Sequence, residues 1–239
     1  MVIKYLLSSL MLLLSCSSVA SNILQFEGKA YNPETSQLIY TEKHRITLDD
    51  NGEYVEGVVE YVNAEGDVFA AKNISYDASP VAPSFTFYDY RTNHQVEVGR
   101  DNQKISLLSK QGSDEKRDLV DISSEEKVVV DAGFDRFIYY NWDKLIDQKG
   151  ASFAFLAISR AMLVDLDINE TSKDGETITY KVQPSNFILS LLVDPIELTY
   201  DAKTQRLLRF EGLTNIPKSL NGSVQDENYV AVIQYHYAQ

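Results

Sequence analysis

The sequence predicts a mainly β protein built on one large curved antiparallel sheet, an open or half β-barrel covered by two short helices. Apolar and polar residues alternate with a period of two through most of the chain, which is typical of strands with one buried face. Turn-forming pairs such as Asn51-Gly52 and Glu65-Gly66 separate these segments at short intervals. Only two segments show the wider apolar spacing of helices.

The first half of the chain is predicted to contain strands alone. We expect them at 23–31, 38–48, 53–62, 68–76, 84–90, 95–99, 104–109 and 127–131. Pro80 and Pro83 exclude their segment from the interior of a ladder, because proline has no backbone N–H to donate. The charged stretch 111–126 is interpreted as a long hairpin connection.

A first helix is predicted after Gly133. Six apolar residues lie on one helical face: Phe134, Phe137, Ile138, Trp142, Leu145 and Ile146. Asp131 is the expected N-cap and Gly150 the expected left-handed C-terminal cap.

The remaining strands are expected at 152–158, 163–170, 176–183, 196–200, 206–211 and 229–237. A short apolar helix at 187–193 interrupts them, capped by Ser185 and ended by Asp194-Pro195. Residues 213–228 are interpreted as a polar loop. We expect the two helices to close the mouth of the half-barrel as plugs. The alternation alone fits two packed sheets equally well.

The first twenty residues predict export. Lys4 precedes an apolar run at 5–14, and Ser18-Val19-Ala20 forms a cleavage site for a signal peptide of residues 1–20. About ten apolar residues are too few to span a bilayer, which requires about 20. The remainder, 21–239, is expected to form a single β-rich domain.

A second interpretation of the same segment is lipidation. Leu13-Leu14-Ser15-Cys16 resembles the lipobox of bacterial lipoproteins, in which cleavage before the cysteine leaves a thiol that carries lipid. Ser17 would then favour the outer membrane. Both interpretations place the protein in the periplasm or at the outer membrane of a Gram-negative bacterium.

Composition restricts the partners. The chain has 22 basic and 35 acidic residues, a net charge of −13, and a single cysteine. Phosphate binding needs clustered Lys and Arg, so no nucleic-acid partner is expected. The exported domain has no cysteine pair, so its stability must come from burial rather than from disulfides.

No motif predicts a catalytic, metal or cofactor site. His44, His94 and His236 are not spaced as metal ligands, and neither a G-x-S-x-G turn nor a phosphate-binding glycine loop occurs.

The best polar candidates lie on one predicted strand face. Tyr40, Glu42 and His44 alternate onto the same side, where a Glu and a His can share a proton or orient a ligand. Ordinary cross-strand pairing on a solvated face is the simpler explanation.

Aromatic residues are the second set of candidates. Rings supply area to an apolar cavity and tyrosine hydroxyls orient what it binds, although core packing accounts for most such residues. The aromatic residues expected to line a cavity are Phe85, Phe87, Tyr88, Tyr90, Phe134, Trp142 and Phe187.

Four segments resemble an uncharacterised family of exported proteobacterial proteins. They are 130–137 (VDAGFDRF), 141–143 (NWD), 192–200 (LVDPIELTY) and 206–212 (RLLRFEG). The overall pattern of a signal, a curved sheet and helical plugs is also similar to the periplasmic lipoprotein carrier and its outer-membrane receptor. This second resemblance is architectural and implies no binding residue.

The sequence therefore predicts a non-enzymatic cell-envelope protein that binds an apolar or amphipathic ligand, such as a lipid, under its helices. Two alternatives remain open at this stage. One is an interaction or scaffold module with an envelope protein partner and no small ligand, and the other is a hydrolase that uses Glu42 and His44.

Overall fold

The computed structural model describes residues 22–101, 103–122, 128–190, 194–220 and 223–238. The predicted signal peptide and Cys16 lie outside these residues. So does the end of the second predicted helix, at 191–193.

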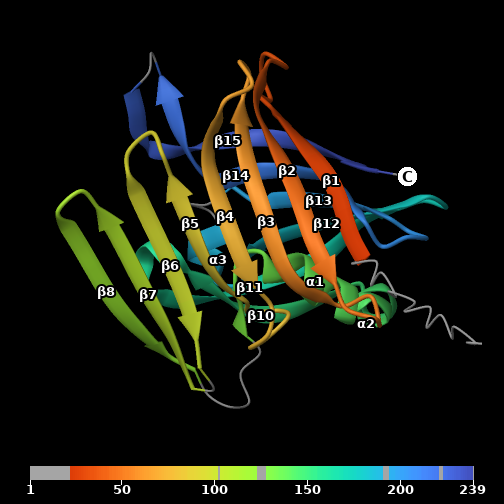
Figure 1. The fold of residues 1–239 in the computed structure, drawn as a ribbon. Coiled ribbons are helices and arrows are strands. Elements are labelled where there is room, and N and C mark those ends of the chain that lie inside the picture. The colour runs from red at the N-terminus through yellow and green to blue at the C-terminus, as the bar shows by residue number, and fades with distance from the viewer. Residues whose placement is uncertain (1–21, 102, 123–127, 191–193, 221–222, 239) are drawn as a thin grey trace, which may run out of the picture.

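The described chain forms one curved sheet of fifteen strands, which confirms the predicted fold class (Figure 1). The strand order is β8-β7-β6-β5-β4-β3-β2-β1-β15-β14-β13-β12-β11-β10-β9. The chain therefore builds two halves, here called the first wing (β1–β8) and the second wing (β9–β15), that join where β1 pairs with β15. All neighbours are antiparallel except β9 and β10.

The strands of the first wing are β1 (Asn22–Tyr31), β2 (Leu38–Leu48), β3 (Tyr54–Asn63), β4 (Val68–Ser75), β5 (Ser84–Asp89), β6 (His94–Arg100), β7 (Lys104–Gln111) and β8 (Asp114–Asp121). Those of the second are β9 (Val128–Val129), β10 (Gly150–Ala157), β11 (Met162–Lys173), β12 (Thr177–Pro184), β13 (Ile196–Asp201), β14 (Leu207–Leu220) and β15 (Ser223–Tyr237). A 3₁₀ turn, Ile158–Arg160, connects β10 to β11.

The alternation of apolar and polar residues in the sequence matches the alternation of buried and less buried side chains in the strands. Buried and half-buried residues alternate without a break in β5 and β12. Between β3 and β4 the turn depends on Gly66, whose φ of 98° lies in the region that only glycine adopts freely. The side chain of Asn63 closes this turn by accepting a hydrogen bond from the Asp67 N–H at 2.8 Å.

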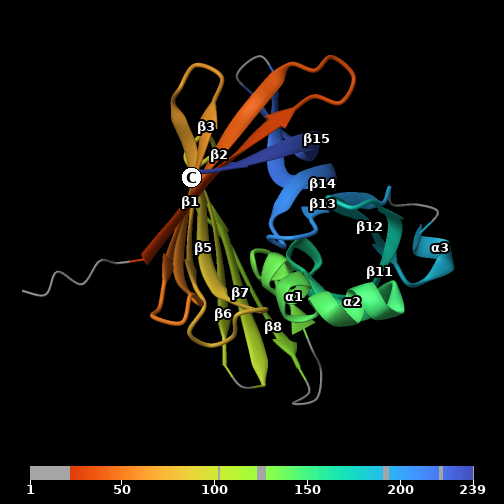
Figure 2. The same ribbon diagram turned by 90° about the vertical axis from the view of Figure 1, so that its right-hand side faces the viewer.

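The two wings pack against each other through a hydrophobic cluster, here called core A. Figure 2 shows the wings from the side, facing each other across it. Core A includes Tyr40, Tyr61, Ile74, Phe85 and Ile105 of the first wing and Val128, Leu156 and Ile216 of the second. A hydrogen bond of 3.0 Å from the Val130 N–H to the Val81 carbonyl also joins the wings.

The first predicted helix is two helices, α1 (Gly133–Tyr140) and α2 (Trp142–Gln148). The chain turns at Asn141, with φ −109° and ψ 14°, and its side-chain amide donates to the Phe137 carbonyl at 2.8 Å. Both helices lie in the curve of the second wing (Figure 2). Their apolar face forms core B with β10–β13, which includes Phe137, Trp142, Leu145, Phe153, Ile168, Tyr180 and Tyr200.

The predicted caps of this helical segment are wrong. The N-cap is Ala132, and no side chain caps it. Asp131 has a φ of 38°, and its carboxylate instead meets the buried Lys72 ammonium at 2.5 Å. At the other end the left-handed residue is Lys149, and Gly150 begins β10. The Asp131 carboxylate therefore pairs with Lys72 rather than with the helix N-terminus, and Gly150 belongs to the ladder of β10 rather than to the helix C-terminus.

Two segments interpreted as connections are largely strands. In the first, residues 114–121 form β8, and in the second, residues 213–220 and 223–228 form the distal part of the β14–β15 hairpin, in which Leu220 pairs with Ser223. The first segment is polar because β8 lies at the edge of the sheet, where most of its residues are exposed. In the second segment Thr214 and Ile216 are buried, and the polar residues gather toward the tip of the hairpin, so little apolar alternation is visible in the sequence.

The second predicted helix is not a plug. Its described part is α3 (Phe187–Ser190), a helix of four residues that follows β12 at the end of the molecule farthest from the first wing (Figure 2). Phe187 is 74% exposed and Ile188 is 69% exposed. The helices that cover the sheet are therefore α1 and α2. In the described part of the chain, none of the helices combines the length and apolarity needed to cross a bilayer.

Candidate functional site

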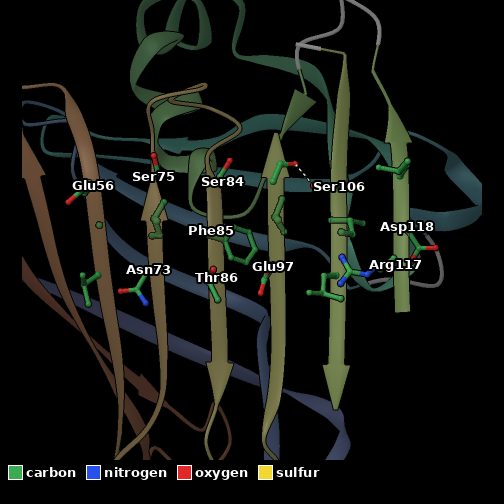
Figure 3. Close-up of a pocket in the computed structure, with 18 residues that line it drawn as sticks. Glu56, Asn73, Ser75, Ser84, Phe85, Thr86, Glu97, Ser106, Arg117 and Asp118 are labelled. Carbon is green, nitrogen blue, oxygen red and sulfur yellow. Dashed lines mark hydrogen bonds between the residues drawn. The ribbon is translucent and has the colours of Figure 1, made fainter. Parts of the chain in front are cut away.

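A hollow of about 930 Å³ crosses the outer face of the first wing, on the side away from the helices (Figure 3). Strands β3 to β8 all contribute to it. Two rows of directly opposed residues run across these strands and form its floor.

The first row consists of small residues. Ser75 lies opposite Ser84 on β4 and β5, and Gly99 lies opposite Ser106 on β6 and β7. Glu56 on β3 and Leu119 on β8 end the row. A Cβ at Gly99 would lie 2.6 Å from the Ser106 hydroxyl, so glycine permits this close approach of side chain to backbone.

The serine hydroxyls of this row are occupied by nearby backbone groups. The Ser84 Oγ accepts from the Arg100 N–H at 3.2 Å, and the Ser106 hydroxyl donates to the Gly99 carbonyl at 3.4 Å. Ser75 accepts from the Asp77 N–H at 3.5 Å. Because these polar atoms already have partners, the row forms a less polar floor than its composition suggests.

The second row alternates between apolar and polar groups. It runs from β3 to β8 through Val58, Asn73, Thr86, Glu97, Leu108 and Arg117, each opposite the next. Val58 is 40% exposed and Leu119, in the first row, is 67% exposed. The hollow therefore offers exposed apolar side chains beside small ones, with carboxylates at a few fixed points.

Tyr40, Glu42 and His44 lie on one face of β2, as the alternation predicts, but that face points between the wings. The Glu42 carboxylate contacts His44 Nε2 at 3.0 Å and accepts from the Tyr235 hydroxyl of β15 at 3.2 Å. Burial, reinforced by the charge of Glu42, raises the pKa of Tyr235 well above its usual value. This network joins β2 to β15.

Close packing around this network depends on Gly28 of β1. A Cβ there would lie 2.6 Å from a ring carbon of Tyr235, so a side chain would displace the ring that reaches Glu42. His44 stacks on Phe26 with ring centres 4.2 Å apart. Neither Glu42 nor His44 lines the hollow on the outer face.

The four aromatic candidates around β5 divide between its two faces. Phe85 and Phe87 are buried in core A, where the Lys72 ammonium lies 5.0 Å from the Phe85 ring centre. Phe85 borders the hollow but its side chain belongs to the core (Figure 3). Tyr88 and Tyr90 face outward with ring centres 5.1 Å apart, and the Tyr88 hydroxyl donates to Asn93.

The other three aromatic candidates lie in the second wing and do not line the hollow. Phe134 packs on Phe153 with ring centres 5.5 Å apart, and Trp142 is buried against Tyr200 at 5.9 Å. Phe187 projects into solvent. The structure therefore does not assemble the predicted aromatic residues into one cavity.

A titratable carboxyl lies between α1 and the strands. Burial raises the pKa of Asp135 to about 6 from 3.8, although the charge of Arg136, the nearby Tyr200 hydroxyl and the charge of His44 oppose the shift. The folded protein thus binds this proton more tightly than the unfolded chain. The resulting stabilisation is complete below pH 3.8 and is lost as the pH rises through about 6.

We therefore expect Asp135→Asn to stabilise the protein at pH 8, by roughly 1–3 kcal/mol, because the amide removes a charge that is costly to bury. At pH 3.5 the variant and the wild type should unfold with nearly equal free energies. Urea unfolding of both proteins across this range measures the difference. A gain that does not change with pH would contradict the assignment.

The hollow was not predictable from residue types. Its small residues are separated along the chain, and only the strand register places them in one row. Within the described residues, no group of three or more His, Cys, Asp or Glu side chains is arranged to hold a metal ion.

Comparison with known proteins gives one structural likeness. No family model matches the chain, and no curated protein matches its sequence. Among solved structures the chain is similar to a β-barrel-like protein of a domain of unknown function, DUF1849, from Brucella abortus. The TM-score is 0.41 at 8% sequence identity, with 92% of this chain and 98% of that chain covered. We draw no functional conclusion from a likeness at this level.

Proposed function

We propose that this protein is a non-enzymatic binding module of the cell envelope that takes an apolar or amphipathic ligand in the outer-face hollow of the first wing. The observation that carries the proposal is the hollow itself, with its floor of small residues and exposed apolar side chains. The sequence predicted a ligand site under the helices, but in the structure that region is occupied by the packed side chains of cores A and B.

The energetic basis is burial of hydrocarbon. Each methylene that leaves water for an apolar surface contributes about 0.8 kcal/mol. The backbone of the floor already belongs to the strand ladder, so a ligand must bind mainly through side-chain contact rather than by adding a strand. A narrow flexible chain meets this requirement better than a bulky rigid molecule.

Placement in the envelope depends on the N-terminal segment. We expect the full-length chain, expressed in a Gram-negative host, to be recovered from the periplasm or membranes. Native mass spectrometry of that material should show a co-purifying mass released by organic solvent. A diacylglyceryl adduct on Cys16 would support the lipoprotein interpretation, and a chain starting near Ser21 would support simple cleavage. A bare polypeptide without any ligand would count against binding.

Blocking the hollow tests the site directly. We expect Thr86→Phe, in the middle of the second row, to weaken binding of dodecyl maltoside at least about tenfold, because the ring covers the floor, which removes more than about 1.4 kcal/mol of contact. Ser172→Phe, at an exposed position on β11, is the control and should bind as the wild type does. Isothermal titration calorimetry measures both. Equal loss in both variants, or no loss in either, would contradict the assigned site.

The alternative interaction module has its own supporting observation. Leu213 and Val230 lie opposite each other on β14 and β15, and both are nearly half exposed. A stoichiometric protein partner lost on Leu213→Asp, with the hollow variants unaffected, would favour that function.

A further inference from the structure

The ionisable residues that line the hollow are mostly acidic. They are Glu56, Glu97, Asp118 and Arg117, three carboxylates and one guanidinium. The guanidinium of Arg117 is already matched by Glu115 at 2.7 Å, and Asp118 by Lys116 at 3.0 Å.

The two remaining carboxylates have no cationic partner among the described residues. Glu97 accepts a hydrogen bond of 2.5 Å from the neutral amide of Gln95. It lies between Thr86 and Leu108 in the middle of the second row, half-buried (Figure 3). A half-buried carboxylate interacts with an added charge more strongly than a fully solvated one, because the local dielectric constant is lower.

We propose that the hollow selects a cationic amphiphile with a single apolar chain, whose amine or ammonium head lies beside Glu97. This inference rests on the proposed function and names the class of its ligand. The chain crosses β5 and β4 to reach Val58 on β3, three strand spacings or about 14 Å from β6. That span suits a medium-length alkyl chain.

The floor along this path favours a chain over a ring. Ser84 and Ser75 lie beside it with their hydroxyls turned to the backbone, and Asn73 and Thr86 are short. No aromatic side chain of the outer face belongs to the lining, so there is no platform on which a sugar or a base would stack. Exposed Val58 supplies the apolar contact at the far end.

The charge of the whole protein acts in the same direction. At a net charge of −13, its field attracts cations and repels anions over a distance set by ionic strength. Glu115, which contacts Arg117 Nε at 2.7 Å, partly neutralises the only guanidinium in the lining and so weakens its attraction for an anionic head. Both effects disfavour fatty acids and acidic lipids relative to amines of equal chain length.

The test compares three probes that share a dodecyl chain below their critical micelle concentrations. They are dodecyltrimethylammonium, dodecyl maltoside and dodecanoate, each titrated into the full chain by calorimetry. We expect the cation to bind about tenfold more tightly than dodecanoate at low salt, with the neutral probe between them. The preference should decrease as salt is added.

Variants then assign the preference to one residue. We expect Glu97→Gln to reduce the cation-to-anion ratio to about twofold while the affinity for dodecyl maltoside stays within a factor of two. Glu60→Gln changes the net charge equally at an exposed site outside the hollow and should keep most of the ratio. A ratio that falls equally in both variants would assign selectivity to the global field and overturn the role of Glu97.

The inference and the proposed function fail differently. If all three probes bind with equal affinity and Thr86→Phe weakens them all, the hollow binds amphiphiles but does not select a cationic head. If none binds, or if Thr86→Phe changes nothing, the proposed function itself is wrong.

Discussion

Replacing Lys72 with Met should destabilise the protein by about 3–5 kcal/mol, because it leaves a shielded carboxylate without its counter-charge. The Lys72 side chain is 5% exposed and that of Asp131 is 12% exposed, and their charged atoms lie 2.5 Å apart. Asn215 of β14 donates to the other oxygen of Asp131 at 2.8 Å. One carboxylate thus links β4 of the first wing to β14 of the second.

Denaturant unfolding followed by circular dichroism measures this loss, and two variants act as controls. Lys72→Met combined with Asp131→Asn removes both charges and should recover most of the stability. Lys116→Met breaks an exposed pair with Asp118 and should change the free energy of unfolding by less than about 0.5 kcal/mol. A loss below about 1 kcal/mol for Lys72→Met alone would show that this pair does not hold the wings together.

Trp142→Ala should reduce the free energy of unfolding by about 3–5 kcal/mol, since it opens a cavity in core B. Trp142 is 5% exposed and contacts Tyr200 edge to face. Phe187→Ala removes an aromatic ring from the other predicted helix, where the ring is 74% exposed, and should change stability by less than about 0.5 kcal/mol.

These two substitutions distinguish packing from ligand binding, because the sequence predicted both rings to contact a ligand. Stability by urea unfolding and affinity for dodecyl maltoside should be measured on the same preparations. We expect neither variant to alter affinity once it is folded. A folded Trp142→Ala protein with wild-type stability and no binding would return the ligand site to the helices.

The wing arrangement explains why these effects should be large. Strands β9 and β10 are covered on both faces, with Val128 and Leu156 in core A and Val129 and Phe153 in core B. Damage to either core therefore loosens the strands that support the other. The outward-facing residues of the hollow lie on the opposite face of the first-wing strands from core A, so their substitution leaves the core side chains in place and should report on binding alone.

Local sequence determined most of the secondary structure. A period of two in residues such as those of β2 is visible without neighbours, because alternation follows from the geometry of a single strand. It also placed Tyr40, Glu42 and His44 on one face. Alternation could not predict that the Tyr235 hydroxyl donates to Glu42, because the two residues lie 193 positions apart in the chain.

Boundaries were less predictable where a tertiary contact competes with a local preference. Asp131 has the residue type and position of an N-cap, but a buried ammonium is a stronger partner for its carboxylate than a helix N-terminus. The apolar composition of 187–193 predicts a buried helix. The preceding strand β12 carries this segment to the outside of the molecule, where Phe187 contacts solvent rather than a core.

By itself the sequence determined the class of fold, the approximate strands and the apolar face of the first helical segment, because each depends on periodicity along a few residues. Tertiary structure alone decided that β1 pairs with β15, that the wings close on core A, and that the hollow lies outside rather than beneath the helices. Strand register brings Ser75, Ser84, Gly99 and Ser106 together, and register is set by pairing between strands rather than by the composition of any one of them.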